Sequence, residues 1–275
     1  MLNLLLAILS SALVSVTMRI SGSKVKNNIA MLMVNYILCA VLAWSYTGPG
    51  GVGMPFALGL GLGNGVLYLA GFVLLQYNIR RNGVVLSSTF IKLGLLVSMV
   101  VSVAFFGERP GGLQWLGFGL ALAAIVLMNF RPGEGKAGSA GFLLLLLLAG
   151  GGGDAMSKVF EELGNPALSG HFLFFTFATA FVLCALWIVL GKAEKPGKWE
   201  IVFGLLVGIP NFFSAKFLLG ALNNIAAVIV YPVYSVATIL TVTLAGVLLF
   251  REKLEGRQWL ALGIILLALV LLNVR

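Results

Sequence analysis

The residues of this sequence best suited to chemistry are charged groups inside long apolar runs. Lys92 lies in the run 84–106, and Asp154 and Lys158 lie in the run 141–162. Runs of this length are typical of membrane-spanning helices, where a charge is costly and usually marks a substrate or ion pathway. We predict that Lys92 contacts a substrate or a coupling ion. The alternative is a structural ion pair with a carboxylate on another helix.

Asp154 and Lys158 are four residues apart, so they share one helix face and can pair. We predict that Asp154 binds substrate or couples transport to protons, since deep carboxyl groups often serve as proton relays. The competing interpretation makes Asp154 a neutralising partner for Lys158 or Lys92. Lys216, in the run 200–222, either extends its ammonium group to the water boundary or faces a cavity.

Uncharged polar side chains complete the predicted substrate-binding set. Lipid cannot satisfy such groups, so we expect them to face protein or water. Tyr231, Tyr234, Ser235 and Thr238 follow helical spacing and predict one polar stripe, and Ser88 lies one turn before Lys92. The remaining members are amides and phenols in other apolar runs: Asn35, Tyr36, Asn64, Tyr68 and Asn211.

Motifs typical of enzymes and of metal sites are missing from the sequence. It has no HExxH motif and no Cys/His metal spacing, and Gly150–Gly153 lacks the Gly-Lys-Ser/Thr that follows in a phosphate-binding loop. Cys39 and Cys184 lie within apolar runs and are expected to pack as small hydrophobic residues. We therefore expect no enzymatic activity, no cofactor and no metal ion. We also expect the glycines 150–153 to interrupt their helix.

Composition indicates an integral membrane protein. Of 275 residues, 60% are hydrophobic and only 10% are charged, whereas about a quarter are charged in soluble domains. The net charge of +9 does not indicate nucleic acid, because the basic residues lie in short loops. We predict an all-α polytopic membrane protein with ten transmembrane helices: 2–20, 29–46, 56–78, 84–106, 113–130, 141–162, 169–190, 200–222, 226–250 and 257–273.

An internal repeat organises these helices. The segment FGERPGGLQWLGFGLALAAIVLMN at 106–129 returns as FREKLEGRQWLALGIILLALVLLN at 250–273, with 12 of 24 positions identical. Matching Glu, Gln, Trp and Asn residues argue for a true duplication. We predict a first repeat at 1–132 and a second at 133–275. Five helices per copy would place the second copy upside down in the membrane, as in many secondary transporters.

The distribution of Lys and Arg predicts the orientation. Thirteen of these residues fall in loops after the first, third, fifth, seventh and ninth helices, whereas Arg109 and Arg275 lie on the other side. By the positive-inside rule, the basic loops are cytoplasmic and both termini lie outside the cell membrane.

The repeat and its glutamate turns resemble the drug/metabolite transporter superfamily, in its EamA-like branch. The resemblance rests on Phe-Gly-Glu at 106–108 and Phe-Arg-Glu at 250–252, each followed by Gln-Trp-Leu, and on Pro232 early in its helix. It implies a secondary transporter of small metabolites that alternates access about a central cavity bounded by helices 1–4 and 6–9. Many relatives are described with cytoplasmic termini, whereas the loop charges of this sequence predict termini outside the cell.

We therefore expect a carrier for a small polar metabolite. Three intramembrane lysines against one deep carboxylate favour an anionic or zwitterionic substrate, such as an amino acid or organic anion. The expected partners are this substrate, the lipid bilayer and a coupled proton, with the chain a monomer or homodimer. Two other classes of protein are compatible with the sequence: a flippase of a lipid-linked intermediate and a non-transporting membrane scaffold.

Overall fold

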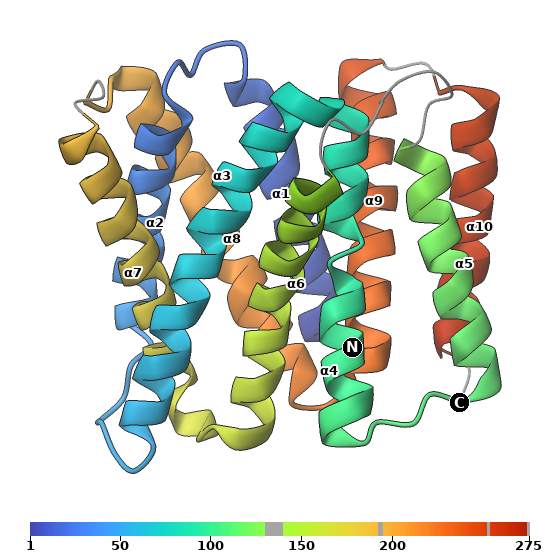
Figure 1. Ribbon diagram of the computed structural model, residues 1–275, viewed down its shortest axis with the longest axis horizontal. Coiled ribbons are helices and arrows are strands. Elements are labelled where there is room, and N and C mark those ends of the chain that lie inside the picture. Colours follow the sequence, from blue (N-terminus) through green and yellow to red (C-terminus); the bar gives the residue numbers. More distant parts are fainter. Residues whose placement is uncertain (130–139, 192–194, 252–253, 274–275) are drawn as a thin grey trace. The chain divides into compact units, whose positions relative to one another are not determined.

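The computed structural model describes residues 1–129, 140–191, 195–251 and 254–273, and these residues form helices joined by turns, with no strand among them (Figure 1). This confirms the predicted all-α class. The helices are α1 (Leu2–Ser21), α2 (Asn28–Trp44), α3 (Met54–Lys92), α4 (Leu95–Phe106), α5 (Gly112–Asn129), α6 (Ala140–Leu163), the 3-10 helix η1 (Pro166–Leu168), α7 (Ser169–Leu190), α8 (Lys198–Leu222), α9 (Ala227–Phe250) and α10 (Gly256–Asn273).

Most of these helices are apolar enough to cross a bilayer. Among the described residues, 7 helices meet the length and hydropathy of a membrane span, and three shorter apolar helices cover 28–44, 90–106 and 112–128. A span needs about 20 residues at a rise of 1.5 Å per residue. The protein is therefore a multi-pass membrane protein, while the number of ten crossings stays a prediction.

One helix departs from the sequence analysis. We expected a loop between 78 and 84, but α3 runs through this segment as a helix of 39 residues, and the chain breaks only after Lys92. The polar residues here are satisfied without leaving the helix: Asn82 donates to Asn78 Oδ1 at 2.7 Å, and Arg81 donates to the Tyr77 hydroxyl at 2.7 Å. The ribbon of α3 turns sharply in its second half (Figure 1).

The chain divides into two compact units, and each takes residues from both halves of the sequence. Unit 1 comprises Met1–Leu69 and Val159–Asn223, and unit 2 comprises Ala70–Lys158 and Asn224–Arg275. Helices α3 and α6 each contribute one part to unit 1 and the other part to unit 2. The division into repeats at 1–132 and 133–275 is a property of sequence and stays a prediction.

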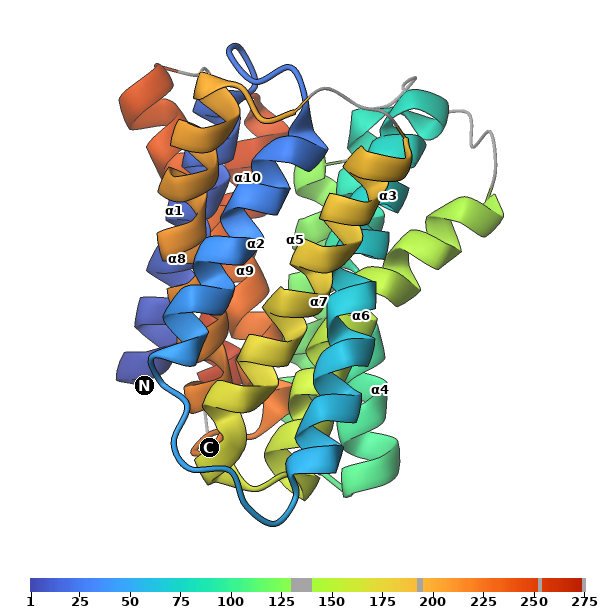
Figure 2. The ribbon, with the colours of Figure 1, turned by 90° about the vertical axis from the view of Figure 1, so that its left-hand side faces the viewer.

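In unit 1, α8 packs against both α1 and α2, and α2 packs against α7 (Figure 2). The first part of α3 adds to this row through two glycines that allow close approach to α7. A Cβ atom at Gly61 would lie 2.6 Å from the Phe175 Cβ, and one at Gly65 would lie 2.4 Å from the Thr176 carbonyl oxygen. These glycines therefore serve tight helix packing, as small residues often do in membranes.

In unit 2, α9 lies between neighbours: it contacts α4, α10 and α5, and α5 packs along α10 (Figure 1). Contrary to our expectation, the glycines at 150–153 do not interrupt α6. They lie where α6 packs against the break between α3 and α4. A Cβ atom at Gly151 would lie 2.0 Å from the Gly94 carbonyl oxygen. Glycine is used here for contact between two backbones rather than as a break.

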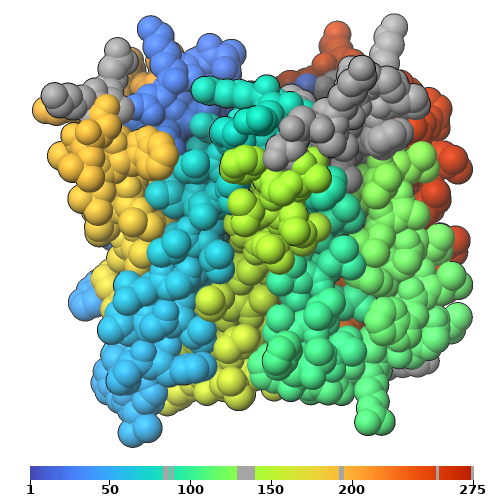
Figure 3. All heavy atoms as spheres, in the orientation of Figure 1, coloured from blue at the N-terminus to red at the C-terminus, as the bar shows by residue number. Residues whose placement is uncertain are grey.

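The exposed surface of α5 is apolar, as a lipid-facing surface must be. In the space-filling view, α5 forms a continuous ridge of side chains (Figure 3). Its exposed residues include Leu113, Trp115, Leu116 and Val126. The charged and polar groups considered next are mostly half-buried or buried, so the two kinds of surface are separated.

Candidate functional site

The turn after α4 positions a glutamate against the start of α9. Helix α4 ends at Gly107, whose left-handed φ of 67° reverses the chain, and the Glu108 N–H donates to the Ser102 carbonyl at 3.2 Å. The N–H groups of Ala227 and Val228 donate to Oε1 and Oε2 of Glu108, both at 2.9 Å. A carboxylate at this place satisfies unpaired N–H groups of the first turn and complements the helix dipole.

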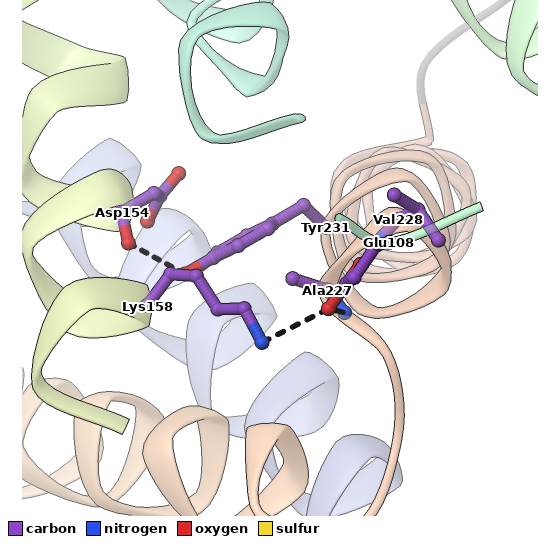
Figure 4. A network of polar contacts seen from close by, with 6 residues as sticks. All are labelled: Glu108, Asp154, Lys158, Ala227, Val228 and Tyr231. Carbon is purple, nitrogen blue, oxygen red and sulfur yellow. Dashed lines mark hydrogen bonds and ion pairs between the residues drawn. The ribbon is translucent and has the colours of Figure 1, made fainter. Parts of the chain in front are cut away.

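The same carboxylate neutralises a buried lysine. Lys158 Nζ lies 2.9 Å from Oε1 of Glu108, and only 3% of the lysine side chain is exposed (Figure 4). The ammonium group also lies 5.8 Å from the centre of the Phe106 ring. Sequence spacing had suggested Asp154 as the partner of Lys158. The structure adds a partner from outside α6, and the Asp154 carboxylate does not point toward the Lys158 ammonium (Figure 4).

Asp154 is held at its backbone by α9. The hydroxyl of Tyr231, a residue with no exposed surface, donates to the Asp154 carbonyl oxygen at 2.5 Å (Figure 4). This bond fixes the helix turn that carries Asp154 and leaves its carboxylate for other contacts. Tyr231 is thus a positioning residue at this site.

Lys92 and Asp154 form a charge pair without direct contact. Both are half-buried, and they are near enough to interact electrostatically. Within the described part of the chain, neither side chain takes part in a hydrogen bond or a salt bridge. Both residues belong to unit 2, with Lys92 at the end of α3 and Asp154 in the middle of α6.

The predicted stripe on α9 faces protein at two of its four positions. Tyr231 and Thr238 are buried, while Tyr234 and Ser235 are half-buried. Thr238 Oγ1 is buried and makes no hydrogen bond with any described residue. The side chain of Ser88, predicted to bind substrate, lies outside the described residues. Helix α9 contacts α4.

Unit 1 contains a second polar cluster, which is uncharged. The Asn211 amide donates to Oδ1 of Asn35 at 3.2 Å, and the Cys39 thiol donates to the Gly208 carbonyl at 3.2 Å. Further along, Asn64 donates to the Thr176 hydroxyl at 3.4 Å. Two amide atoms, Nδ2 of Asn35 and Oδ1 of Asn64, are buried without a hydrogen-bond partner in the described chain.

Aromatic rings surround this cluster. Tyr36 and Tyr68 lie 6.4 Å apart between ring centres, and both rings also contact Phe177. Lys216 directs its ammonium group onto the ring of Tyr46, at 3.1 Å from the centroid, which stabilises the charge by a cation–π contact. The two predicted places of Lys216, the water boundary and a cavity, stay predictions.

The predicted site residues therefore divide between the two units. Asn35, Tyr36, Asn64, Tyr68, Asn211 and Lys216 belong to unit 1, and Lys92, Asp154, Lys158, Tyr231, Tyr234, Ser235 and Thr238 belong to unit 2. Within the described segments, no group of three His, Cys, Asp or Glu residues could hold a metal ion. The predicted site residues carry ammonium, carboxylate, amide, hydroxyl and phenol groups.

Comparison with known proteins identifies the family. Residues 1–130 and, separately, residues 138–274 match the EamA-like transporter family. The chain belongs to this family. The resemblance drawn from the glutamate turns is confirmed, and the EamA-like chain is a membrane transporter of small molecules.

Two further matches cover nearly the whole EamA-like chain. An uncharacterized protein of Haemophilus influenzae is 24% identical over 280 residues, covering 94% of this chain and 93% of that protein. A crystal structure of a protein superposes with a TM-score of 0.73 at 16% identity, covering 99% of this chain and 95% of the other. The second likeness shows the fold alone.

Sequence reasoning recognised Glu108 as a family mark but missed its contacts. In this EamA-like chain the residue caps α9 and pairs with Lys158. The sequence contains no signal for either contact, since the acidic turn precedes α5 and not α9. Glu252, at the second of these turns, lies outside the described residues.

Proposed function

We propose that the chain is a secondary active transporter of a small zwitterionic or anionic metabolite, an amino acid or organic anion, which works by alternating access. The observation that carries the proposal is the pair Lys92 and Asp154. These residues have opposite charges, are half-buried in unit 2 and make no direct contact with each other. A charge retained inside apolar helices without a direct partner is expensive and indicates a function.

The other two intramembrane lysines sharpen the substrate class. Lys158 is already neutralised by Glu108, and Lys216 is stabilised by the Tyr46 ring. Lys92 and Asp154 then remain as one positive and one negative group. A zwitterion complements both, since its carboxylate suits the Lys92 ammonium and its amine suits the Asp154 carboxylate. This favours an amino acid over a simple anion.

We further assign proton coupling to Asp154. When the substrate leaves, the carboxylate loses its cationic partner, and taking up a proton removes the cost of a lone buried charge. Tyr231, which bonds to the Asp154 backbone, would keep the carboxyl group in place through the cycle.

The test is uptake into vesicles that contain the purified protein. A thermal-shift screen of metabolites first identifies a binder, since ligands that bind the folded state raise its stability. Uptake of that amino acid is then compared with uptake of its N-acetyl and methyl ester derivatives, which keep one charge each. Lys92→Gln should reduce uptake by about tenfold or more, the effect of roughly 1.4 kcal/mol or more of lost binding.

Arg80→Gln provides the matched control, because Arg80 is exposed and its loss removes the same charge elsewhere in α3. Asp154→Asn should abolish uptake driven by a proton gradient while the protein remains folded. Uptake by Lys92→Gln vesicles at the wild-type rate would refute the assignment.

Cysteine labelling separates this proposal from the other two classes. Lys92→Cys, Asp154→Cys and Ser235→Cys, in a protein without Cys39 and Cys184, should all react with water-soluble reagents if they line a carrier cavity. A scaffold should protect all three positions. A flippase should admit lipid-soluble reagents to the same positions.

A further inference from the structure

Unit 1 carries a basic pocket that the proposed transport cycle does not use. Its volume is about 240 Å³, and it lies between the connection from α1 to α2 and the start of α8. Its lining includes four lysines and one carboxylate, which are Lys24, Lys26, Lys195, Lys198 and Glu200. The lining also includes Trp199.

The single carboxylate of the pocket is committed to the backbone. Oε1 of Glu200 accepts hydrogen bonds from the N–H groups of Lys26 at 2.9 Å and Asn27 at 3.3 Å. Glu200 is buried, with 7% of its surface exposed, and it fastens the connection between α1 and α2 to α8. Glu200 thus shapes the pocket rather than neutralising the lysine side chains.

The four lysines have no acidic partner among the residues that the structure describes. All four are exposed, and none forms a salt bridge with a residue that the structure describes. Lys24 Nζ lies 4.4 Å from the centre of the Trp199 ring, which orders one ammonium group at the pocket wall. With four positive charges and one negative charge among its side chains, the pocket has an excess of positive charge that an anionic ligand would balance.

The start of α8 places Trp199 at the pocket. Helix α8 has 25 residues, and Glu200 is the acidic residue of its first turn. The exposed Trp199 is a residue type enriched at the membrane–water boundary.

We propose that this pocket binds a phosphate group, and that the headgroup of an anionic phospholipid is its main source. Basic clusters beside membrane helices attract anionic lipids, at about 1 kcal/mol per lysine, or roughly fivefold in affinity. The indole of Trp199 would lie at headgroup depth, which a freely dissolved phosphate does not require.

The test measures binding to the full-length purified protein in neutral detergent. The probes are short-chain phosphatidylglycerol, phosphatidylcholine, and inorganic phosphate or glycerol 3-phosphate. The Lys24→Gln/Lys198→Gln variant should bind phosphatidylglycerol about 25-fold more weakly, from about fivefold for each lysine. Arg80→Gln/Arg81→Gln, which removes the same charge from unit 2, should bind as the wild type does.

Trp199→Ala distinguishes the two sources. If the ligand is a lipid, Trp199→Ala weakens binding of phosphatidylglycerol and leaves the weaker binding of glycerol 3-phosphate unchanged. If glycerol 3-phosphate binds as tightly as the lipid and needs the same lysines, the site is a phosphate site for a soluble molecule. If neither probe binds, or if both double variants lose affinity equally, the proposal is wrong.

Discussion

The two units stabilise their buried polar groups by different interactions. Most polar groups described in unit 1 are neutral, such as Asn35, Asn211 and Asn64, which bond to neighbours one helix away, and its Lys216 lies against an aromatic ring. Unit 2 uses charges, and its Lys158 depends on Glu108 from a separate turn. Neutral groups need only a nearby partner, whereas a buried charge needs an opposite charge and further hydrogen bonds. The comparison predicts that unit 2 is the more sensitive to single substitutions.

The largest effect should come from breaking the ion pair of unit 2. Glu108→Gln leaves the Lys158 charge without its partner and weakens the cap of α9, so it should lower the free energy of unfolding by about 3–5 kcal/mol. Thermal unfolding in detergent measures this loss. Glu255→Gln is the control, because Glu255 is exposed in the corresponding turn of the second repeat, 3.5 Å from Arg257.

Removing both charges tests the reason for that loss. Glu108→Gln/Lys158→Met leaves no lone buried charge, and it should recover most of the stability lost in Glu108→Gln. A double variant as unstable as Glu108→Gln would show that the cap of α9, and not the ion pair, accounts for the effect.

The next effect concerns helix packing in unit 1. Gly65→Ala places a Cβ atom 2.4 Å from the Thr176 carbonyl oxygen, so α3 and α7 must separate, at a cost of about 1–3 kcal/mol. Gly59→Ala is the matched control in the same helix, because a Cβ atom there has nothing within 4 Å. It should raise stability by up to about 1 kcal/mol, since alanine favours the helix. Equal effects at both positions would contradict the close approach.

The smallest effect should come from the neutral cluster of unit 1. Asn211→Leu removes the hydrogen bond to Asn35, and hydrogen bonds between membrane helices contribute only about 0.6 kcal/mol on average. The expected change in the unfolding midpoint is therefore a few degrees at most. A loss as large as that of Glu108→Gln would remove the distinction between the two units.

Helix positions were largely predictable, because hydropathy is a local property. The run 169–190 was predicted to the residue, and it forms α7. The continuous helix through 79–83 was not predictable from polarity, because Asn82 donates to Asn78 inside the helix and Asn78 donates to the carbonyls of Leu74 and Phe142. The pairing of Glu108 with Lys158 was also beyond reach, since it joins a turn to a helix far along the chain. Spacing predicts partners on one helix and cannot reveal those that depend on tertiary packing.

The contacts between α6 and α9 have a mechanical consequence. Helix α9 is attached to α6 at two points one turn apart. Tyr231 of α9 bonds directly to the Asp154 carbonyl, and Glu108, which caps the first residues of α9, pairs with Lys158. Sliding or rotating α6 by a single turn would break both attachments together. We therefore expect α6 and α9 to move together as one rigid body. Any displacement of α9 would then displace the Asp154 carboxylate as well.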